Sequence, residues 1–262
     1  MKIGAQLYNV REFTQDEVSY RKTIKKISAI GYKYAQYSAV SENISAQAIK
    51  AINDEYGIDI PLCHVNALTL IENTKKVIEY QKTIGVKYLG IGMLPISKYG
   101  LSEEGISAFI RDFNPVAQAI RDAGMKFMYH NHQIEFIKAG GKLIIDALAD
   151  GFAPNLMGFI LDLYWVQVGG GNPAAWIKKF AGRVEAIHLK DMIIYNESDK
   201  YAPAQRFAPI YEGNLDWASI FDAANKAGTE YAFVEQDDAY DADPFDCLKI
   251  SLKNIERNYT NS

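Results

Sequence analysis

Hydrophobic and polar positions along the chain fall into two kinds of block that follow one another. Short apolar runs, roughly four to eight residues long and rich in Ile, Val, Tyr and Phe, match strands buried on both faces. The segments between them place apolar residues at helical spacing. Eight such runs begin near Ile3, Lys33, Ile58, Val86, Lys126, Met157, Val184 and Tyr231.

The segments between the runs predict helices that stop at glycine, a residue that readily takes the left-handed conformation found after a helix. Five segments, each followed directly by a glycine, cover residues 18–30, 45–56, 72–84, 102–123 and 216–227. At the start of the first, Thr14 and Glu17 predict a capping box. The repeated order of helix, glycine and strand is typical of a parallel α/β fold.

Eight strand–helix units in about 250 residues match a (β/α)8 TIM barrel. The competing doubly wound sheet usually carries G-x-G-x-x-G after an early strand, whereas the first run here continues as QLYNVRE. No linker or change of composition divides the chain, so a single domain over residues 1–262 is expected. Residues 192–214, the longest stretch without a pattern, predict a long functional loop after the seventh strand.

Composition narrows the class further. The apolar fraction of 48% and the charged fraction of 23% are those of a globular protein. The balance of 28 basic and 32 acidic residues gives a net charge of −4, which argues against nucleic acid as a partner. No apolar run reaches the roughly 18 residues that span a bilayer. The first residues lack a secretory pattern and Cys63 and Cys247 are too few for a disulfide scaffold, so a cytoplasmic location is expected.

All four histidines of the chain fall at the ends of predicted strands. They are His64, His130, His132 and His188. In a barrel enzyme the chemistry lies at the carboxyl ends of the strands, so this placement indicates one shared site. For any one of them alone, a hydrogen-bonded core residue is the simpler interpretation.

Three carboxylates share that placement. Asp162 interrupts the apolar run GFILDLYW, Glu235 ends YAFVE, and Glu135 follows the histidine pair by a few residues. A buried carboxylate must be paired or bind a metal, and a mixed set of histidine and carboxylate suits Mn, Mg, Co or Zn. The alternatives are a helix cap at Asp162, an ion pair of Glu235 with Lys190, and a loop role for Glu135.

Several motifs in order give a resemblance to a known family. They are LYNVRE, YHNHQIEF, LDLYWVQVGGGNP, HLKDM, EGNLDW and VEQDD, and they run from the first strand to the last helix. With them the chain resembles the sugar phosphate isomerase/epimerase family of the xylose isomerase-like TIM barrel superfamily. The motifs together are specific for the superfamily and do not identify a substrate.

The resemblance implies a divalent metal held by Glu, Asp, His and Glu from the last four strands. Asp162, His188 and Glu235 match three of these positions. At the fourth, where relatives usually carry glutamate, this chain has His130. Either His130 is the ligand, or Glu135 reaches back to the metal and frees His130 as an acid or base; we favour Glu135. A second departure lies in the second strand, where many relatives carry glutamate and this chain has Gln36.

The implied reaction is isomerisation or epimerisation of a sugar or keto-sugar, phosphorylated or not. His130 or Glu235 would take a proton next to a carbonyl, the metal would stabilise the resulting ene-diolate, and Lys190 would neutralise an oxyanion. Loss of a β-oxygen instead would make the enzyme a lyase or dehydratase of a keto-sugar, keto-inositol or 3-keto-glycoside. A non-catalytic sugar-binding barrel and a DNA-repair endonuclease of the same superfamily are the rival interpretations.

Four further residues, at or just after the ends of predicted strands, are expected to bind the substrate. They are Tyr8, His64, His132 and Trp165. A small sugar or keto-sugar is the expected partner, with no nucleic acid and no membrane. A homodimer is left open.

Overall fold

The computed structural model describes residues 1–196 and 203–259. Eight parallel strands form a closed barrel in which β1 pairs with both β2 and β12. In chain order the barrel strands are β1 (Lys2–Gln6), β2 (Tyr34–Tyr37), β3 (Asp59–Val65), β4 (Tyr88–Ile91), β5 (Lys126–His130), β8 (Met157–Asp162), β9 (Val184–Leu189) and β12 (Tyr231–Val234). Each of the eight predicted runs therefore forms one strand of the barrel, and the predicted (β/α)8 barrel is confirmed.

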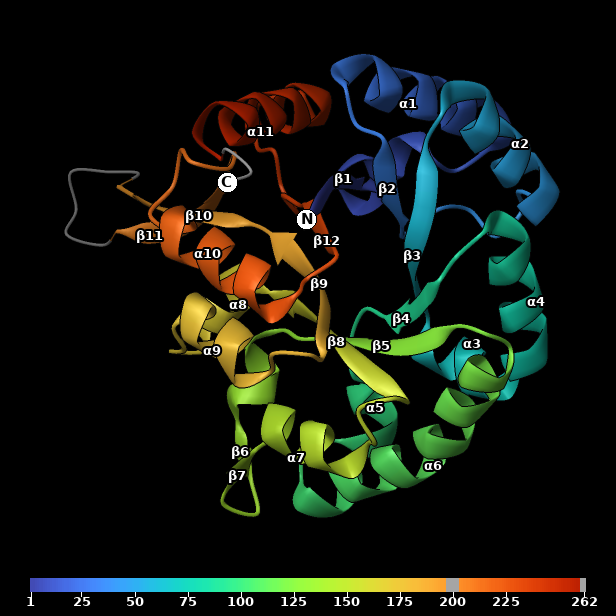
Figure 1. The fold of residues 1–262 in the computed structure, drawn as a ribbon, viewed down its shortest axis with the longest axis vertical. Coiled ribbons are helices and arrows are strands. Elements are labelled where there is room, and N and C mark those ends of the chain that lie inside the picture. Colours follow the sequence, from blue (N-terminus) through green and yellow to red (C-terminus); the bar gives the residue numbers. More distant parts are fainter. Residues whose placement is uncertain (197–202, 260–262) are drawn as a thin grey trace.

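Helices surround the barrel as an outer ring, as Figure 1 shows. This ring consists of α1 (Glu17–Ile30), α2 (Ala46–Tyr56), α4 (Thr74–Ile84), α6 (Glu103–Asp122), α7 (Ile144–Gly151), α9 (Pro173–Lys179), α10 (Trp217–Ala227) and α11 (Pro244–Asn258). Shorter helical segments lie between five of the strands and the helices of the ring: η1 (Leu7–Phe13), α3 (Ala67–Glu72), α5 (Ile96–Tyr99), η2 (Gln133–Phe136) and α8 (Leu163–Val168). Over the described part of the chain, no helix combines the length and apolar character that a membrane crossing needs.

The hydrophobic core has two layers, because each strand is covered on both faces. A small cluster fills the inside of the barrel, with Leu62, Met128, Ile160 and Phe233 all fully buried. A much larger cluster lies between the strands and the ring of helices. This double burial explains why the strands are apolar along their whole length instead of alternating.

Helix ends follow the predicted glycines, but the start of α1 does not follow the predicted capping box. After α2 and α10, Gly57 and Gly228 adopt left-handed backbone angles, with φ of 65° and 76°. At α1 the cap is Asp16, whose carboxylate accepts the amide hydrogen of Ser19 at 2.9 Å. The Thr14 hydroxyl instead donates to backbone carbonyls, so the capping box was wrong: Asp16, next to the first helical residue, is the better placed acceptor.

The predicted loop over residues 192–214 contains a β-ribbon. The strands β10 (Asp191–Tyr195) and β11 (Ala204–Ala208) pair antiparallel immediately after barrel strand β9. The expectation of an unpatterned loop is therefore corrected; residues 197–202 lie outside the described residues. A smaller hairpin, β6 (Lys138–Ala139) and β7 (Lys142–Leu143), follows β5.

One buried carboxylate, Asp191, ties the base of this ribbon to the start of α10. It is fully buried and uses both oxygens as acceptors. Its donors are the backbone amides of Met192 at 2.8 Å, Tyr211 at 3.0 Å, Gly213 at 3.1 Å and Leu215 at 3.3 Å, and the indole of Trp217 at 2.7 Å. These bonds fix the segment that leaves the barrel mouth beside strand β9.

Replacing Asp191 by alanine should lower the free energy of unfolding by about 3 kcal/mol, because four backbone amides and the buried Trp217 indole lose a shared acceptor. Urea denaturation followed by circular dichroism measures the change. The matched control is Asp222→Ala, which removes an exposed ion pair with Lys226 and should cost less than about 0.5 kcal/mol. Equal losses in the two variants would contradict the anchoring role of Asp191.

Candidate metal centre and active site

Four buried side chains from neighbouring strands meet at the mouth of the barrel. His130 ends β5, Asp162 ends β8, His188 lies in β9, and Glu235 directly follows β12. These four strands are consecutive in the barrel, so their carboxyl ends lie side by side. Each residue offers one ligand atom, and all four atoms lie within 4.8 Å of one another. We call these four residues the ligand cluster.

Hydrogen bonds to the backbone set the protonation of His130 and the orientation of Asp162. The Nδ1 of His130 lies 2.9 Å from the carbonyl oxygen of Gly92, which can only accept, so Nδ1 carries the hydrogen and Nε2 is bare. Asp162 caps α8 by accepting the amide hydrogen of Trp165 at 3.1 Å through Oδ1. Its Oδ2 is thereby left to face His130 Nε2, 3.4 Å away. Asp162 is thus both a helix cap and a member of the cluster.

His188 is held in a similar way by Gln36 of β2. Its Nε2 lies 2.8 Å from the amide oxygen of Gln36, and its Nδ1 faces Glu235 Oε2 at 2.6 Å and Asp162 Oδ2 at 3.7 Å. Burial alone would lower the pKa of His188, but the two carboxylates outweigh it and raise this pKa to about 9. Gln36 therefore orients a potential ligand from the opposite side, as partners of metal-binding histidines do.

The donor set fits the divalent metal that the resemblance implies. One atom from each member of the cluster is buried without a well-formed hydrogen bond: His130 Nε2, Asp162 Oδ2, His188 Nδ1 and Glu235 Oε2. The two carboxylate oxygens among them are ion-paired with Lys190. The convergence of four such donor atoms indicates that a metal ion can be shared among them. Two imidazole nitrogens and two carboxylate oxygens suit Zn, Mn or Co.

Glu135 does not join the ligand cluster, contrary to the expectation that it reaches back to the metal. Its carboxylate accepts the Tyr129 hydroxyl and the backbone amide of His132, each at 2.7 Å. These bonds direct the side chain into the start of η2, where it closes a capping box. The structure instead brings His130, the other candidate for the fourth position, into the cluster.

Lys190 is the buried cation beside the cluster. Its ammonium lies 2.9 Å from Asp162 Oδ2, 2.9 Å from Glu235 Oε2 and 3.1 Å from Asp237 Oδ2. Burial works against the charged form, but the three carboxylates outweigh it and hold the pKa of Lys190 above its ordinary value. Asp237 was missed in the sequence, although the VEQDD motif places it two residues after Glu235.

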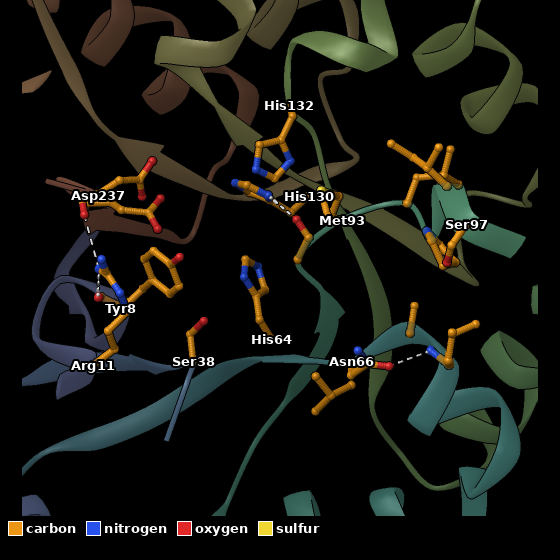
Figure 2. A pocket seen from close by; sticks show the side chains of 18 of the residues that line it. Tyr8, Arg11, Ser38, His64, Asn66, Met93, Ser97, His130, His132 and Asp237 are labelled. Atoms are coloured by element: carbon orange, nitrogen blue, oxygen red, sulfur yellow. Dashed lines mark hydrogen bonds between the residues drawn. The ribbon is translucent and has the colours of Figure 1, made fainter. Parts of the chain in front are cut away.

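A cavity of about 820 Å³ opens beside the cluster (Figure 2). Three of the predicted substrate-binding residues, Tyr8, His64 and His132, line it. Burial lowers the pKa of His132 to about 3 and that of His64 well below its ordinary value, so both are neutral at pH 7. Trp165 is not among the lining residues; its ring packs against that of His132, with 5.5 Å between centroids. Arg11, which also lines the cavity, was missed.

Comparison with known proteins places this geometry in context. Residues 24–253 match the family model described as the xylose isomerase-like TIM barrel. An inosose dehydratase of Clostridium beijerinckii is 28% identical over 171 residues, which cover 61% of this chain and 56% of that protein. The chain thus spans about half the length of this relative. An inosose dehydratase of Geobacillus kaustophilus is 22% identical over 94% of this chain and 87% of its own length.

Solved structures show the same fold. A sugar phosphate isomerase/epimerase of Parabacteroides distasonis superposes with a TM-score of 0.80 at 20% identity, covering 98% of both chains. A structure of the IolI protein with a bound zinc atom superposes with a TM-score of 0.73 at 14% identity, covering all of both chains. At these identities the likeness concerns the barrel itself.

The pKa of Glu135 gives a test by pH. Burial raises it from 4.5 to about 7, against the hydrogen bonds that it accepts, so the folded protein keeps this proton to higher pH than the unfolded chain. The free energy of unfolding should therefore fall by up to about 3 kcal/mol between pH 4.5 and 7. Urea titrations of Glu135→Gln should lack this decline, while the exposed-site control Glu103→Gln should keep it. Parallel curves for wild type and Glu135→Gln would contradict the raised pKa.

Proposed function

The chain belongs to the xylose isomerase-like TIM barrel family, and from that premise we propose that it is a divalent-metal-dependent isomerase or epimerase of a sugar or keto-sugar. The observation that carries the proposal is the ligand cluster, four donor atoms within 4.8 Å of one another at the mouth of the barrel next to a large cavity. The mouth is where enzymes of this fold place their chemistry.

The four members of the cluster differ in what they can reach. Asp162 and His188 are fully buried and do not line the cavity, so they would serve only to hold the metal. His130 and Glu235 are also buried, yet both line the cavity and would meet a substrate as well. When bound, the metal would act as a Lewis acid that stabilises negative charge on a substrate oxygen.

Proton transfer is assigned to Glu235. The single bare nitrogen of His130, Nε2, would hold the metal, and its Nδ1 donates to the Gly92 carbonyl, so His130 has no nitrogen free to take a proton. Glu235 would hold the metal through Oε2, which leaves Oε1 to take a proton next to the substrate carbonyl. Return of that proton to the neighbouring carbon would isomerise the substrate, and return to the opposite face of the same carbon would epimerise it. Lys190, which also lines the cavity, would neutralise a developing oxyanion.

A second candidate is a lyase or dehydratase acting on a keto-sugar, keto-inositol or 3-keto-glycoside. The relatives named inosose dehydratase favour it. It needs the same first step, removal of a proton next to a carbonyl, followed by loss of a β-oxygen. The neutral imidazoles of His64 and His132 would then contact the departing group.

Removing a ligand should remove the metal. After loading with Mn²⁺, Co²⁺ or Zn²⁺ and gel filtration, Asp162→Asn and His188→Ala should each retain less than about a tenth of the metal held by wild type, with unchanged circular dichroism. Elemental analysis measures the content. His130→Ala should behave likewise and Glu135→Gln should hold metal as wild type does. Full retention in Asp162→Asn and His188→Ala would overturn the metal site.

Incubation in heavy water separates the two candidate reactions. Keto-sugars, keto-inositols and 3-keto-glycosides are offered to the metal-loaded enzyme, and the products are followed by NMR and mass spectrometry. An isomerase or epimerase should incorporate deuterium next to the carbonyl and release no fragment, whereas a lyase should release water or an alcohol. Glu235→Gln should slow the reaction by at least about a hundredfold. Binding without exchange or release by any substrate would instead support a non-catalytic sugar-binding barrel.

A further inference from the structure

The cavity beside the ligand cluster has two chemically different ends. Figure 2 shows Tyr8, Arg11 and Asp237 on one side of His64, and Asn66 and Ser97 on the other. Apart from His64 and His132, the ionisable side chains that line the cavity in the described part of the chain belong to the first side or to the cluster. The other side includes Asn66 and Ser97 and a set of apolar residues that we call the apolar wall: Val65, Ala67, Leu68, Met93, Leu94, Pro95 and Ile96.

The residues of the apolar wall lie at the end of β3 and in the segments that follow β3 and β4, two strands that are adjacent in the barrel. Some of their side chains are exposed to solvent. Met93 is 53% exposed and Ile96 is 38% exposed, although both line a concave cavity. Large apolar side chains held open to water in a cavity favour binding of an apolar group, because contact removes their surface from water.

The size of the cavity also favours a ligand that is larger than a single sugar ring. At about 820 Å³ it lies toward the upper end of the roughly 300–1,000 Å³ that accommodate drug-sized ligands. A single sugar ring next to His130 and Glu235 is much smaller than such a ligand. It would leave the space along the apolar wall unfilled, so the wall suits a second part of the substrate.

Charge excludes a phosphate group from that second part. Among the described lining residues, the lysine and arginine side chains are those of Lys190 and Arg11, and both lie at the ionisable end of the cavity. Lys190 is enclosed by three carboxylates. Arg11 donates to the carbonyl oxygens of Tyr8 and Asp237. An anion along the apolar wall would lose its water without gaining a cation.

We propose that the substrate is a keto-glycoside, with its ketone-bearing sugar ring at the ligand cluster and an aryl or alkyl aglycone against the apolar wall. The ring ketone supplies the carbonyl next to which the proposed proton transfer takes place. Met93, Ile96 and Leu68 are then specificity-determining residues. This inference rests on the proposed function, which it narrows to one substrate class, and it disfavours free and phosphorylated sugars. The apolar wall supplies affinity for the aglycone, while the ionisable end orients the ring.

Binding of paired glycosides tests the substrate class without requiring turnover. Isothermal titration of the full-length protein, with and without Mn²⁺, compares methyl and phenyl 3-keto-glycosides of glucose, galactose and mannose in both anomeric forms. In at least one pair the phenyl glycoside should bind about tenfold more tightly than the methyl glycoside, because the ring buries apolar surface. Equal affinity within every pair, or no binding by any of them, overturns the proposal, as does tighter binding of glucose 6-phosphate.

Variants locate the preference. Met93→Glu and Ile96→Glu should each abolish the phenyl-over-methyl preference, while Met93→Leu should preserve it. The matched control is Val18→Glu, which places the same charge at an exposed apolar site on α1, away from the cavity. A preference that survives both glutamate variants overturns the assignment to the apolar wall.

The heavy-water experiment is independent: exchange without a phenyl preference refutes only the substrate class, and a phenyl preference without exchange refutes only the proposed reaction.

Discussion

The site depends on the burial of two carboxylates next to each other. Asp162 and Glu235 are almost fully enclosed at the barrel mouth, where an uncompensated negative charge is strongly unfavourable. The compensation comes from Lys190, whose ammonium contacts one oxygen of each, and from His188 between them. Asp162 Oδ2 and Glu235 Oε2 are also the potential metal ligands of these two residues, together with the nitrogens of His130 and His188. The negative charge that Lys190 balances is therefore the same charge that would attract a metal cation.

The barrel makes this arrangement possible because parallel strands end on the same side. His130, Asp162, His188 and Glu235 are far apart in sequence, yet they stand on consecutive strands. Hydrogen bonds then orient three of these side chains: the Gly92 carbonyl and the Trp165 amide contact His130 and Asp162, and the side-chain amide of Gln36 contacts His188. The fold therefore supplies both the convergence and the orientation of these side chains, while the loops after β3 and β4 shape the cavity.

The pattern of apolar runs predicted the barrel, because strands buried on both faces are apolar along their whole length. The histidines could be placed because each one follows such a run closely or ends it. The pattern could not settle whether Glu135 or His130 completes the cluster. That choice depends on the path of the chain after β5, where Tyr129 and the His132 amide hold the Glu135 carboxylate. The ribbon of β10 and β11 was missed for a related reason. It lies outside the barrel, so its residues lack the continuous apolar character of buried strands.

Asp191 joins the two chain segments that flank the ribbon, since it begins β10, two residues after β9, and accepts hydrogen bonds from the amides of Tyr211 and Gly213. The two ends of the ribbon are therefore fixed next to β9, the strand that carries His188. A change in the length of the ribbon should therefore leave His188 in place at the barrel mouth, because both ends of the ribbon stay joined through Asp191.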